Sequence, residues 1–183
     1  MIRIFDFIFS FVGIILLFPV GVIIYIIGFI DSGSPLFKQE RVGQHKRPFI
    51  LYKFRTMSVK AKSVATHLSN SNDVTNLGRF LRKTKLDELP QLFNVLKGEM
   101  SLVGPRPNLF NQEELLKQRE LLGVYNAVPG ITGLSQINEI DMSTPRELAE
   151  SDAVMLKDLT LSKYFKYILL TIIGKGQGDR IKK

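Results

Sequence analysis

Two adjacent carboxylates, Asp87 and Glu88, are the side chains whose types and spacing in this sequence best suit chemistry. Their surroundings are basic or proline-locked: Arg79, Arg82, Lys83 and Lys85 precede them, and Gly104-Pro105-Arg106-Pro107 follows. Arginine can grip phosphate oxygens with two hydrogen bonds, and Mg²⁺ prefers one or two carboxylates together with substrate phosphates. The pattern therefore indicates a phosphate site with a divalent metal. The alternative is that the acids only stabilise a helix start, where the macrodipole favours them.

A helix is expected around the acids. Pro90 is tolerated in the first turn of a helix, and Gly98 is a suitable terminating residue after the apolar side chains before it. The spacing predicts a helix over roughly residues 86–97 that carries both acids at its amino end. Because the free N–H groups of a helix amino end collect anions, this element would place the acids beside a phosphate group.

A long apolar segment lies near the start of the sequence. Phe7 to Ile30 contains 24 residues without a charge. As a helix it would extend roughly 36 Å, against about 30 Å for the hydrocarbon core of a bilayer. The segment is therefore expected to meet a membrane. A cleaved signal peptide fits poorly, because the apolar run is too long, only Arg3 precedes it and no small-residue cleavage site follows.

Pro19 lies in the middle of this segment and predicts a break. A proline removes one backbone hydrogen bond and kinks a helix, which permits a re-entrant hairpin that enters and leaves on one side. A straight single span with a tolerated proline is the alternative. Arg3 and Asp6 favour the hairpin, because both are costly to carry across lipid. In either case the basic residues that follow Asp31 indicate that the body lies in the cytoplasm.

The remaining residues, Ser32 to Lys183, are numerous enough for one compact domain with its own core. All but one of the 25 Lys and Arg residues and all but two of the 17 Asp and Glu residues lie in this part, which gives it a net charge of +9. Such a surface suits anionic headgroups, nucleotide phosphates or nucleic acid. There is no cysteine, and His45 and His67 are isolated, which excludes disulfides and argues against thiolate or histidine metal sites.

Short elements are expected along this domain. The apolar and aromatic residues 161–173 predict a helix that lies either in a membrane interface or in the protein core, since amphipathicity does not separate the two. The other expected elements are a basic turn at 44–48, a strand at 49–55, a loop or weak helix at 60–75, an amphipathic helix at 109–122 that ends at Gly123, and a rigid turn at 129–133.

Seven ordered motifs connect these features to a known family. They are Arg3-Ile4-Phe5-Asp6 with the proline-broken apolar helix, Pro35-Leu36-Phe37-Lys38-Gln39-Glu40-Arg41-Val42-Gly43, Tyr52-Lys53-Phe54-Arg55-Thr56-Met57, Arg79-Phe80-Leu81-Arg82-Lys83, Leu86-Asp87-Glu88-Leu89-Pro90-Gln91, Met100-Ser101-Leu102-Val103-Gly104-Pro105-Arg106-Pro107 and Pro129-Gly130-Ile131-Thr132-Gly133. In this order the chain resembles the bacterial sugar transferase family, the small monotopic phosphoglycosyl transferases that act on polyprenyl phosphate. The resemblance runs nearly from end to end.

The resemblance implies a reaction and a location. A sugar 1-phosphate passes from a UDP-sugar to undecaprenyl phosphate, UMP is released and Mg²⁺ is required, as the first membrane step of glycoconjugate assembly. The expected fold is α+β and mainly helical. Residues 1–31 form a proline-broken re-entrant membrane helix hairpin, and residues 32–183 form one cytosolic catalytic domain with little strand and interfacial amphipathic helices. The expected partners are the UDP-sugar, polyprenyl phosphate and membrane lipids, not nucleic acid, at the cytoplasmic face of the bacterial plasma membrane.

The resemblance also implies roles for individual residues. Asp87 is expected to attack the phosphate bonded to the sugar and form a covalent phosphosugar intermediate, and Glu88 is expected to hold the magnesium. Asp152 is a second candidate metal ligand. Lys53 and Arg55 suit a diphosphate but suit lipid headgroups equally. The expected phosphate or nucleotide contacts come from Lys53, Arg55, Arg82 and Arg106, with Pro105 and Pro107 fixing the backbone of Arg106.

Some residues depart from the family. Leu134, Ser135 and Tyr164 replace residues that are usual there, so the last third of the chain follows the family least closely. No residue identifies the sugar, the glycoconjugate or the oligomeric state. The alternative to an enzyme is a membrane-anchored binding or scaffold protein whose acids only cap a helix.

Overall fold

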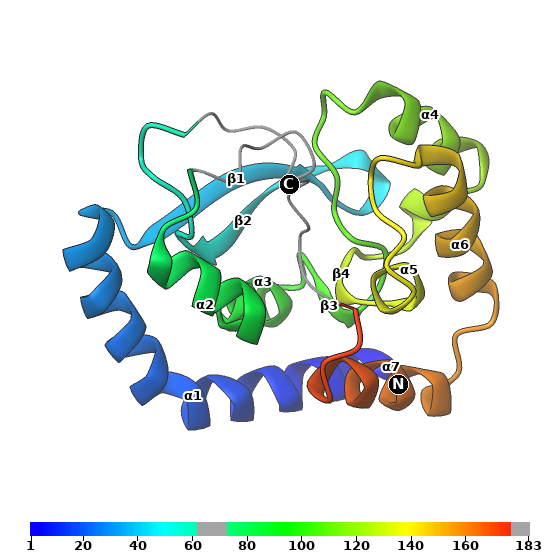
Figure 1. The fold of residues 1–183 in the computed structure, drawn as a ribbon. Helices are drawn as coiled ribbons and strands as arrows, with labels where there is room; N and C mark the ends of the chain where they lie inside the picture. The colour runs from blue at the N-terminus through cyan, green and yellow to red at the C-terminus, as the bar shows by residue number, and fades with distance from the viewer. Residues whose placement is uncertain (62–72, 177–183) are drawn as a thin grey trace.

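The computed structural model describes residues 1–61 and 73–176, which form a body of short helices and strands with one long apolar helix along its side (Figure 1). The described helices are α1 (Ile2–Ser32), α2 (Asn76–Thr84), α3 (Gln91–Lys97), α4 (Glu113–Leu121), α5 (Leu134–Ile137), α6 (Pro145–Lys157) and α7 (Leu161–Ile172), the strands are β1 (Leu36–Val42), β2 (Pro48–Phe54), β3 (Ser101–Val103) and β4 (Gly130–Thr132), and the 3₁₀ turns are η1 (Gln44–Lys46), η4 (Leu86–Glu88) and η5 (Val124–Asn126). The fold is therefore mainly helical with few strands, as the sequence predicts.

The strands form two small sheets within the described residues. β1 and β2 pair antiparallel along their full length, and β3 pairs with β4 in parallel, with Ser101 opposite Gly130. The strand expected at 49–55 is confirmed as β2. The rigid turn expected at 129–133 is wrong in part, because its central residues pair with β3 and form β4. β1 was not predicted.

The core of the body lies where β2, α3, β3 and α6 meet. Phe49 and Leu51 of β2 pack with Val95 of α3. Val103 of β3 packs with Met155 of α6. Burial of apolar side chains of this size stabilises the fold by roughly 1.5–3 kcal/mol each. These contacts fix the elements that carry or adjoin the candidate site.

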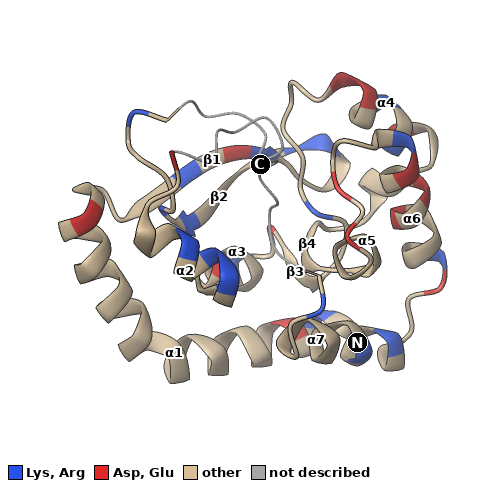
Figure 2. Cartoon of the chain, viewed as in Figure 1, with Lys and Arg blue, Asp and Glu red and all other residues tan. Residues whose placement is uncertain are grey.

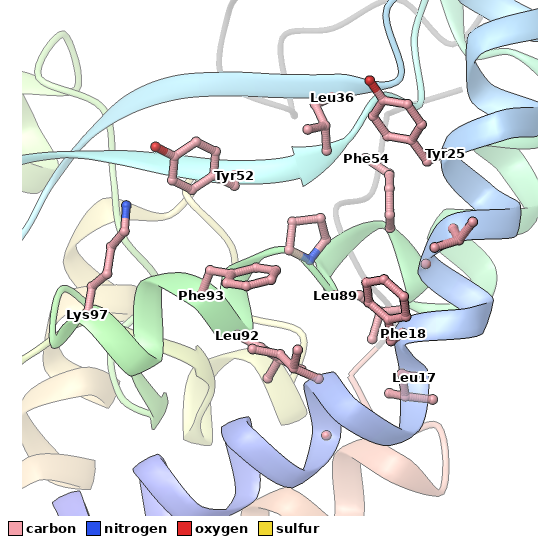
Figure 3. Close-up of a pocket in the computed structure, with 15 residues that line it drawn as sticks. Leu17, Phe18, Tyr25, Leu36, Tyr52, Phe54, Leu89, Leu92, Phe93 and Lys97 are labelled. Atoms are coloured by element: carbon pink, nitrogen blue, oxygen red, sulfur yellow. The ribbon is translucent and has the colours of Figure 1, made fainter.

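α1 is one continuous helix of 31 residues with Pro19 inside it. It is long and apolar enough to cross a membrane, and only 11% of its most apolar window is buried, unlike the core helix of a soluble protein. Figure 2 shows that it is uncharged over most of its length. Its axis bends near Leu17 and Phe18 (Figure 3), next to the proline that removes a backbone hydrogen bond. Pro19 therefore accompanies a bend within one continuous helix, and the re-entrant hairpin stays a prediction.

Both ends of α1 contact the body. Near the amino end, Arg3 donates a hydrogen bond to the carbonyl oxygen of Met100 at 3.0 Å. Near the carboxyl end, Ile24 packs in a buried cluster with Phe54 of β2. Most large apolar side chains between these ends are exposed. Between these ends, Gly13 lies beside Leu92 of α3. α1 therefore runs along the body with one face against it, and its other face is uncovered by the described residues.

Asp6 links α1 to the last helix. Its Oδ1 accepts hydrogen bonds from the hydroxyl of Tyr164 at 2.8 Å, the hydroxyl of Ser101 at 3.0 Å and the N–H of Leu102 at 2.9 Å. Arg3 lies 3.8 Å from the other carboxylate oxygen. Burial and the hydrogen bond to Asp6 raise the pKa of Tyr164, so its hydroxyl keeps its proton and remains a donor. The charges of Arg3 and Asp6 near the amino end are therefore satisfied by contacts with the protein itself.

α7 has two different faces. Tyr164 and Tyr167 are buried with Met155, whereas Leu169 and Ile172 are exposed. Of the two settings expected for this helix, the core setting holds for one face. The face uncovered by the described residues is amphipathic, because the exposed Lys166 lies on it together with Leu169.

Two further boundaries differ from expectation. α4 begins at Glu113 and not at 109, because the side chain of Gln112 accepts a hydrogen bond from the N–H of Leu109 at 2.9 Å and stabilises a turn there. Gly123, with φ 68°, follows the end of α4 as predicted. Most of the loop or weak helix expected at 60–75 lies outside the described residues.

Candidate active site

The two acids lie in η4, the 3₁₀ turn between α2 and α3. Lys85 ends α2 with φ 58°, and Pro90 is the N-cap of α3. The expectation of one helix over 86–97 is therefore wrong at its start, because Pro90 has no N–H to continue a hydrogen-bond ladder from residues before it. Asp87 is buried and Glu88 is half-buried.

Two cations hold Glu88. Its Oε1 accepts hydrogen bonds from Nζ of Lys53 and from Nη2 of Arg106, each at 3.0 Å. The same Nζ of Lys53 lies 4.0 Å from Oδ2 of Asp87. β2, η4 and the loop after β3 therefore bring four sequence-predicted site residues together.

The loop that carries Arg106 is fixed through its backbone. The carbonyl oxygen of Arg106 accepts a hydrogen bond from Nη1 of Arg119 at 2.8 Å. The carbonyl oxygen of Pro107 accepts one from Arg41 at 3.1 Å, and that of Pro105 accepts one from the first N–H of β4 at 2.9 Å. Both prolines are buried, so they contribute to the site through the conformation of the loop.

Glycines allow the strands beneath this loop to approach closely. A Cβ at Gly130 of β4 would lie 2.0 Å from the backbone nitrogen of Gly104, which directly follows β3. No side chain fits in that space, so both positions require glycine for the loop to start where it does.

Asp152 does not join the two acids in the described structure. It is fully buried in α6, where its Oδ2 accepts hydrogen bonds from Arg119 at 2.6 and 3.1 Å and its Oδ1 accepts one from Ser135 at 2.8 Å. Burial raises the pKa of Asp152, while Arg119 and Ser135 act in the opposite direction. In the described structure Asp152 has a structural role, and its metal coordination stays a prediction. It holds Arg119, which in turn holds the carbonyl of Arg106.

Sequence reasoning missed Arg119 and Asn108. Nη1 of Arg119 also donates to Oδ1 of Asn108 at 2.9 Å, so both residues support the loop of Arg106. A signal existed for Arg119, since it lies four residues after the buried Leu115 and therefore on the same helix face. A charge on an apolar face indicates a buried partner.

The other two predicted arginines differ in their setting. Nε of Arg82 donates to the hydroxyl of Thr56 at 2.9 Å, and its Nη1 is buried and forms no hydrogen bond within the described residues. That donor suits an anion. Arg55 instead donates to the carbonyl of Ser34 at 2.7 Å and lies over the ring of Phe37. The structure therefore uses Arg55 to hold the segment that leads into β1.

Lys85 adds a further positive charge near the acids, which the sequence did not single out. Burial lowers its pKa, Glu88 raises it and Arg106 lowers it. Its ammonium group therefore interacts electrostatically with both site residues. Its Nζ donates to the carbonyl of Lys175 at 2.8 Å. The segment after α7 is thereby connected to the turn that carries the acids.

The donor set can be compared with what a magnesium ion requires. Residues 1–61 and 73–176 contain no cluster of three histidine, cysteine or acidic side chains that could enclose a metal. Adjacent carboxylates still fit Mg²⁺, which binds through one or two carboxylates plus substrate phosphates and keeps several waters. Asp87 and Glu88 therefore suit an ion that arrives with a diphosphate.

Known proteins resemble this chain over most of its length. The model of the family "Bacterial sugar transferase" matches residues 1–176. The sugar transferase EpsL of Bacillus subtilis is 38% identical over 161 residues, which cover 87% of this chain and 77% of EpsL. The undecaprenyl-phosphate galactose phosphotransferase of Salmonella typhimurium is 38% identical, and the UDP-glucose:undecaprenyl-phosphate glucose-1-phosphate transferase of Caulobacter vibrioides is 36% identical. The matches cover 78% of this chain but 34% and 57% of those two relatives.

The turn of two acids, its cations and the apolar helix thus belong to a membrane-associated transferase of sugar phosphates. The chain is a member of the bacterial sugar transferase family, and it is an enzyme of that class.

Proposed function

We propose that the protein transfers a sugar 1-phosphate from a UDP-sugar to a polyprenyl phosphate and releases UMP. The observation that supports this most directly is the convergence of Lys53 and Arg106 on Glu88 beside the buried Asp87. Arg82, on the helix that directly precedes η4, adds a buried donor without a hydrogen bond in the described residues. Positive groups of this kind suit a diphosphate. The names of the Salmonella and Caulobacter relatives point to the same substrates.

Asp87 is the proposed nucleophile. One of its carboxylate oxygens attacks the phosphorus bonded to the sugar, and the bond from that phosphorus to the bridging oxygen breaks. The bridging oxygen leaves with the electron pair as part of UMP, and an aspartyl-phosphosugar remains. Lys53, 4.0 Å from Oδ2, orients this carboxylate and offsets the charge that gathers around the phosphorus.

The acceptor completes the transfer. An oxygen of the polyprenyl phosphate attacks the same phosphorus, and the bond to Asp87 breaks, which restores the carboxylate. The product is a polyprenyl diphosphate sugar. Splitting the transfer into two displacements lets one small site receive two bulky substrates in turn.

Mg²⁺ is part of the proposal. Glu88, with Asp87, would hold the ion, which when bound supplies positive charge to the diphosphate. In this protein the side chains that orient Glu88 are Lys53 and Arg106. Arg106 and the unsatisfied donor of Arg82 bind phosphate oxygens and position the leaving nucleotide.

We further propose that α1 enters the membrane and leaves it on the cytoplasmic side of the plasma membrane. The contacts of Arg3 and Asp6 with the body support this, since a helix that crossed fully would carry both charges to the far side. The bend beside Pro19 supports it as well. Basic residues follow α1 closely, which favours the cytoplasmic face.

The test separates the two displacements. Purified protein is mixed with Mg²⁺ and a panel of UDP-sugars without acceptor. The reaction is quenched in acid, and the mass of the intact protein is measured by mass spectrometry. One sugar phosphate per chain and one equivalent of UMP are expected. Added undecaprenyl phosphate should then remove the label and allow repeated UMP release.

Asp87→Asn should abolish labelling and lower turnover by at least about 10³-fold, because an amide is a poor nucleophile. Asp158→Asn, at an exposed position in the same domain, is the matched control and should behave like the parent. Full activity of Asp87→Asn would support a scaffold role for the acids. Release of free sugar in place of a lipid-linked product would overturn the transferase assignment.

A further inference from the structure

An apolar cavity lies between α1 and the body (Figure 3). Its volume is about 450 Å³, within the roughly 300–1,000 Å³ of small-molecule sites. Three phenylalanines from three elements face it: Phe18 of α1, Phe54 of β2 and Phe93 of α3. Among the described residues that line it, the side chains with polar groups are Tyr25, Tyr52 and Lys97. Such a wall suits a ligand that is apolar over most of its length.

Two glycines of α1 line this cavity. A Cβ at Gly13 would lie 3.3 Å from Leu92, so glycine lets α1 approach α3 closely there. A Cβ at Gly21 would lie 4.0 Å from Phe54, so only a larger side chain would reach into the space. Glycine inside a helix costs about 1 kcal/mol relative to alanine.

The cavity adjoins the two acids through shared backbone. Leu89 and Pro90 line it and directly follow the acids in the chain. On β2, Tyr52 and Phe54 line it, while Lys53 between them holds the second acid. Successive side chains of a strand point to opposite faces, so β2 separates the apolar cavity from the charged site by one layer of backbone.

We propose that this cavity binds the part of the isoprenoid chain nearest the phosphate of the polyprenyl phosphate acceptor. The inference rests on the proposed function and adds the place where the acceptor is held. Its occupant must be apolar, must come from the membrane that α1 meets, and must end in an anion near Lys53, Arg82 and Arg106. Polyprenyl phosphate meets all three conditions. A phospholipid meets the first two, but its phosphate diester has no role in the transfer.

Filling the cavity tests the inference. Gly21→Leu places a side chain against Phe54 and also favours the helix. We expect the KM for undecaprenyl phosphate to rise at least about tenfold, because a blocked apolar pocket loses contacts with the chain. Labelling by the UDP-sugar without acceptor should be unchanged. Ile23→Phe, at an exposed position of α1 outside the cavity, is the control and should leave both measurements unchanged.

The outcomes separate the cavity from the reaction. An unchanged acceptor KM in Gly21→Leu, with labelling intact, overturns the cavity assignment and leaves the transferase standing. Failure of the parent protein to take up a sugar phosphate overturns the transferase itself.

A second measurement uses the unaltered protein. A polyprenyl phosphate with a photoreactive isoprene should cross-link to Phe18, Leu92 or Phe93, and undecaprenyl phosphate should suppress this reaction. Cross-links confined to other positions would contradict the proposal. So would cavity labelling by a photoreactive phospholipid that undecaprenyl phosphate does not displace.

Discussion

At the scale of single residues, the cations around Asp87 and Glu88 determine what the two acids can bind. Three cations act on them: Lys53 and Arg106 lie within ion-pair distance, and Lys85 interacts electrostatically with Glu88. A site with this surplus attracts an anion and holds it more tightly than it holds a neutral sugar. One oxygen of Glu88 accepts hydrogen bonds from Lys53 and Arg106, and Asp87 lies deeper, with its Oδ2 4.0 Å from the ammonium group of Lys53. The two chemically similar side chains therefore differ in their burial.

The first prediction concerns the pH dependence of donor binding. Because burial lowers the pKa of Lys85 below its ordinary 10.5, its ammonium group loses its proton earlier than an exposed lysine as the pH rises. The affinity for the UDP-sugar should fall as that charge is lost. In Lys85→Arg the guanidinium stays charged, so the alkaline fall in kcat/KM for the donor should move to higher pH.

Lys83→Arg is the control, because Lys83 is exposed on α2. Its pH profile should match that of the parent. Coincident alkaline limbs for the parent and Lys85→Arg would show that Lys85 does not govern donor binding.

The sequence predicted which residues lie together where the site is built from short motifs. Asp87, Glu88 and Arg106 lie in such motifs, and the structure brings them together with Lys53. It did not predict the surroundings of Asp152, because the partner that engages its carboxylate, Arg119, lies 33 residues away. Only the tertiary contact between α4 and α6 reveals that pair.

At the scale of elements, the α4–α6 contact supports the loop of the site through a buried ion pair. Removing one partner of such a pair leaves an uncompensated charge and costs about 3–5 kcal/mol. Arg119→Met should therefore lower the free energy of unfolding by that amount, as measured by chemical denaturation in detergent micelles. Replacing both Arg119 and Asp152 by apolar residues should cost less than the single change.

α6, the helix that carries Asp152, supplies the control for the Arg119→Met prediction. Arg146 pairs with Glu150 on the exposed face of α6, so Arg146→Met should change stability by less than about 0.5 kcal/mol. If Asp152→Asn retained full stability but lost magnesium affinity, the carboxylate would be a metal ligand after all.

The third prediction concerns the bend of α1. The sequence has no cysteine, so Ile4→Cys and Ile30→Cys, at exposed positions, can carry a pair of spin labels. A straight helix would separate these positions by about 39 Å. The parent should show a shorter distance, and Pro19→Ala should lengthen it because the missing backbone hydrogen bond is restored.

Leu16→Ala, an exposed change one turn earlier, should leave the label distance unchanged. Equal distances in Pro19→Ala and the parent would assign the bend to packing against the body. Sequence patterns predicted the presence of α1 and of its proline. They could not predict that the helix stays continuous, because contacts of Arg3 and Ile24 with the body hold both of its ends.

At the scale of the whole molecule, α1 and α7 present one apolar surface. Phe5 of α1 and Phe165 of α7 pack edge to face with ring centres 5.3 Å apart, and Figure 1 shows the two helices side by side. The exposed Leu169 and Ile172 continue the apolar character of α1. Amphipathic helices of this kind bind membrane interfaces, so the proposed anchoring involves both ends of the chain.

The fourth prediction tests the link between these helices. Tyr164→Phe removes one donor from the buried carboxylate of Asp6 and should lower the free energy of unfolding by about 1–3 kcal/mol. Tyr25→Phe, on an exposed part of α1, should have little effect. A double-mutant cycle with Asp6→Asn should give a coupling of roughly 0.5–3 kcal/mol. Additive effects would show that the two helices are stabilised independently.

The hydrogen bond between Asp6 and Tyr164 also orders events during synthesis. Its partners are separated by 158 residues. Asp6 is synthesised first, and Tyr164 follows only after nearly the entire chain has been made. Ser101 and Leu102, its other donors, emerge in between. Because a ribosome extends the chain at about 5–20 residues per second, roughly 8–30 s separate the synthesis of Asp6 from that of Tyr164. The full set of donors to the carboxylate of Asp6 therefore becomes available only when nearly the entire chain, including the active-site turn, has been made.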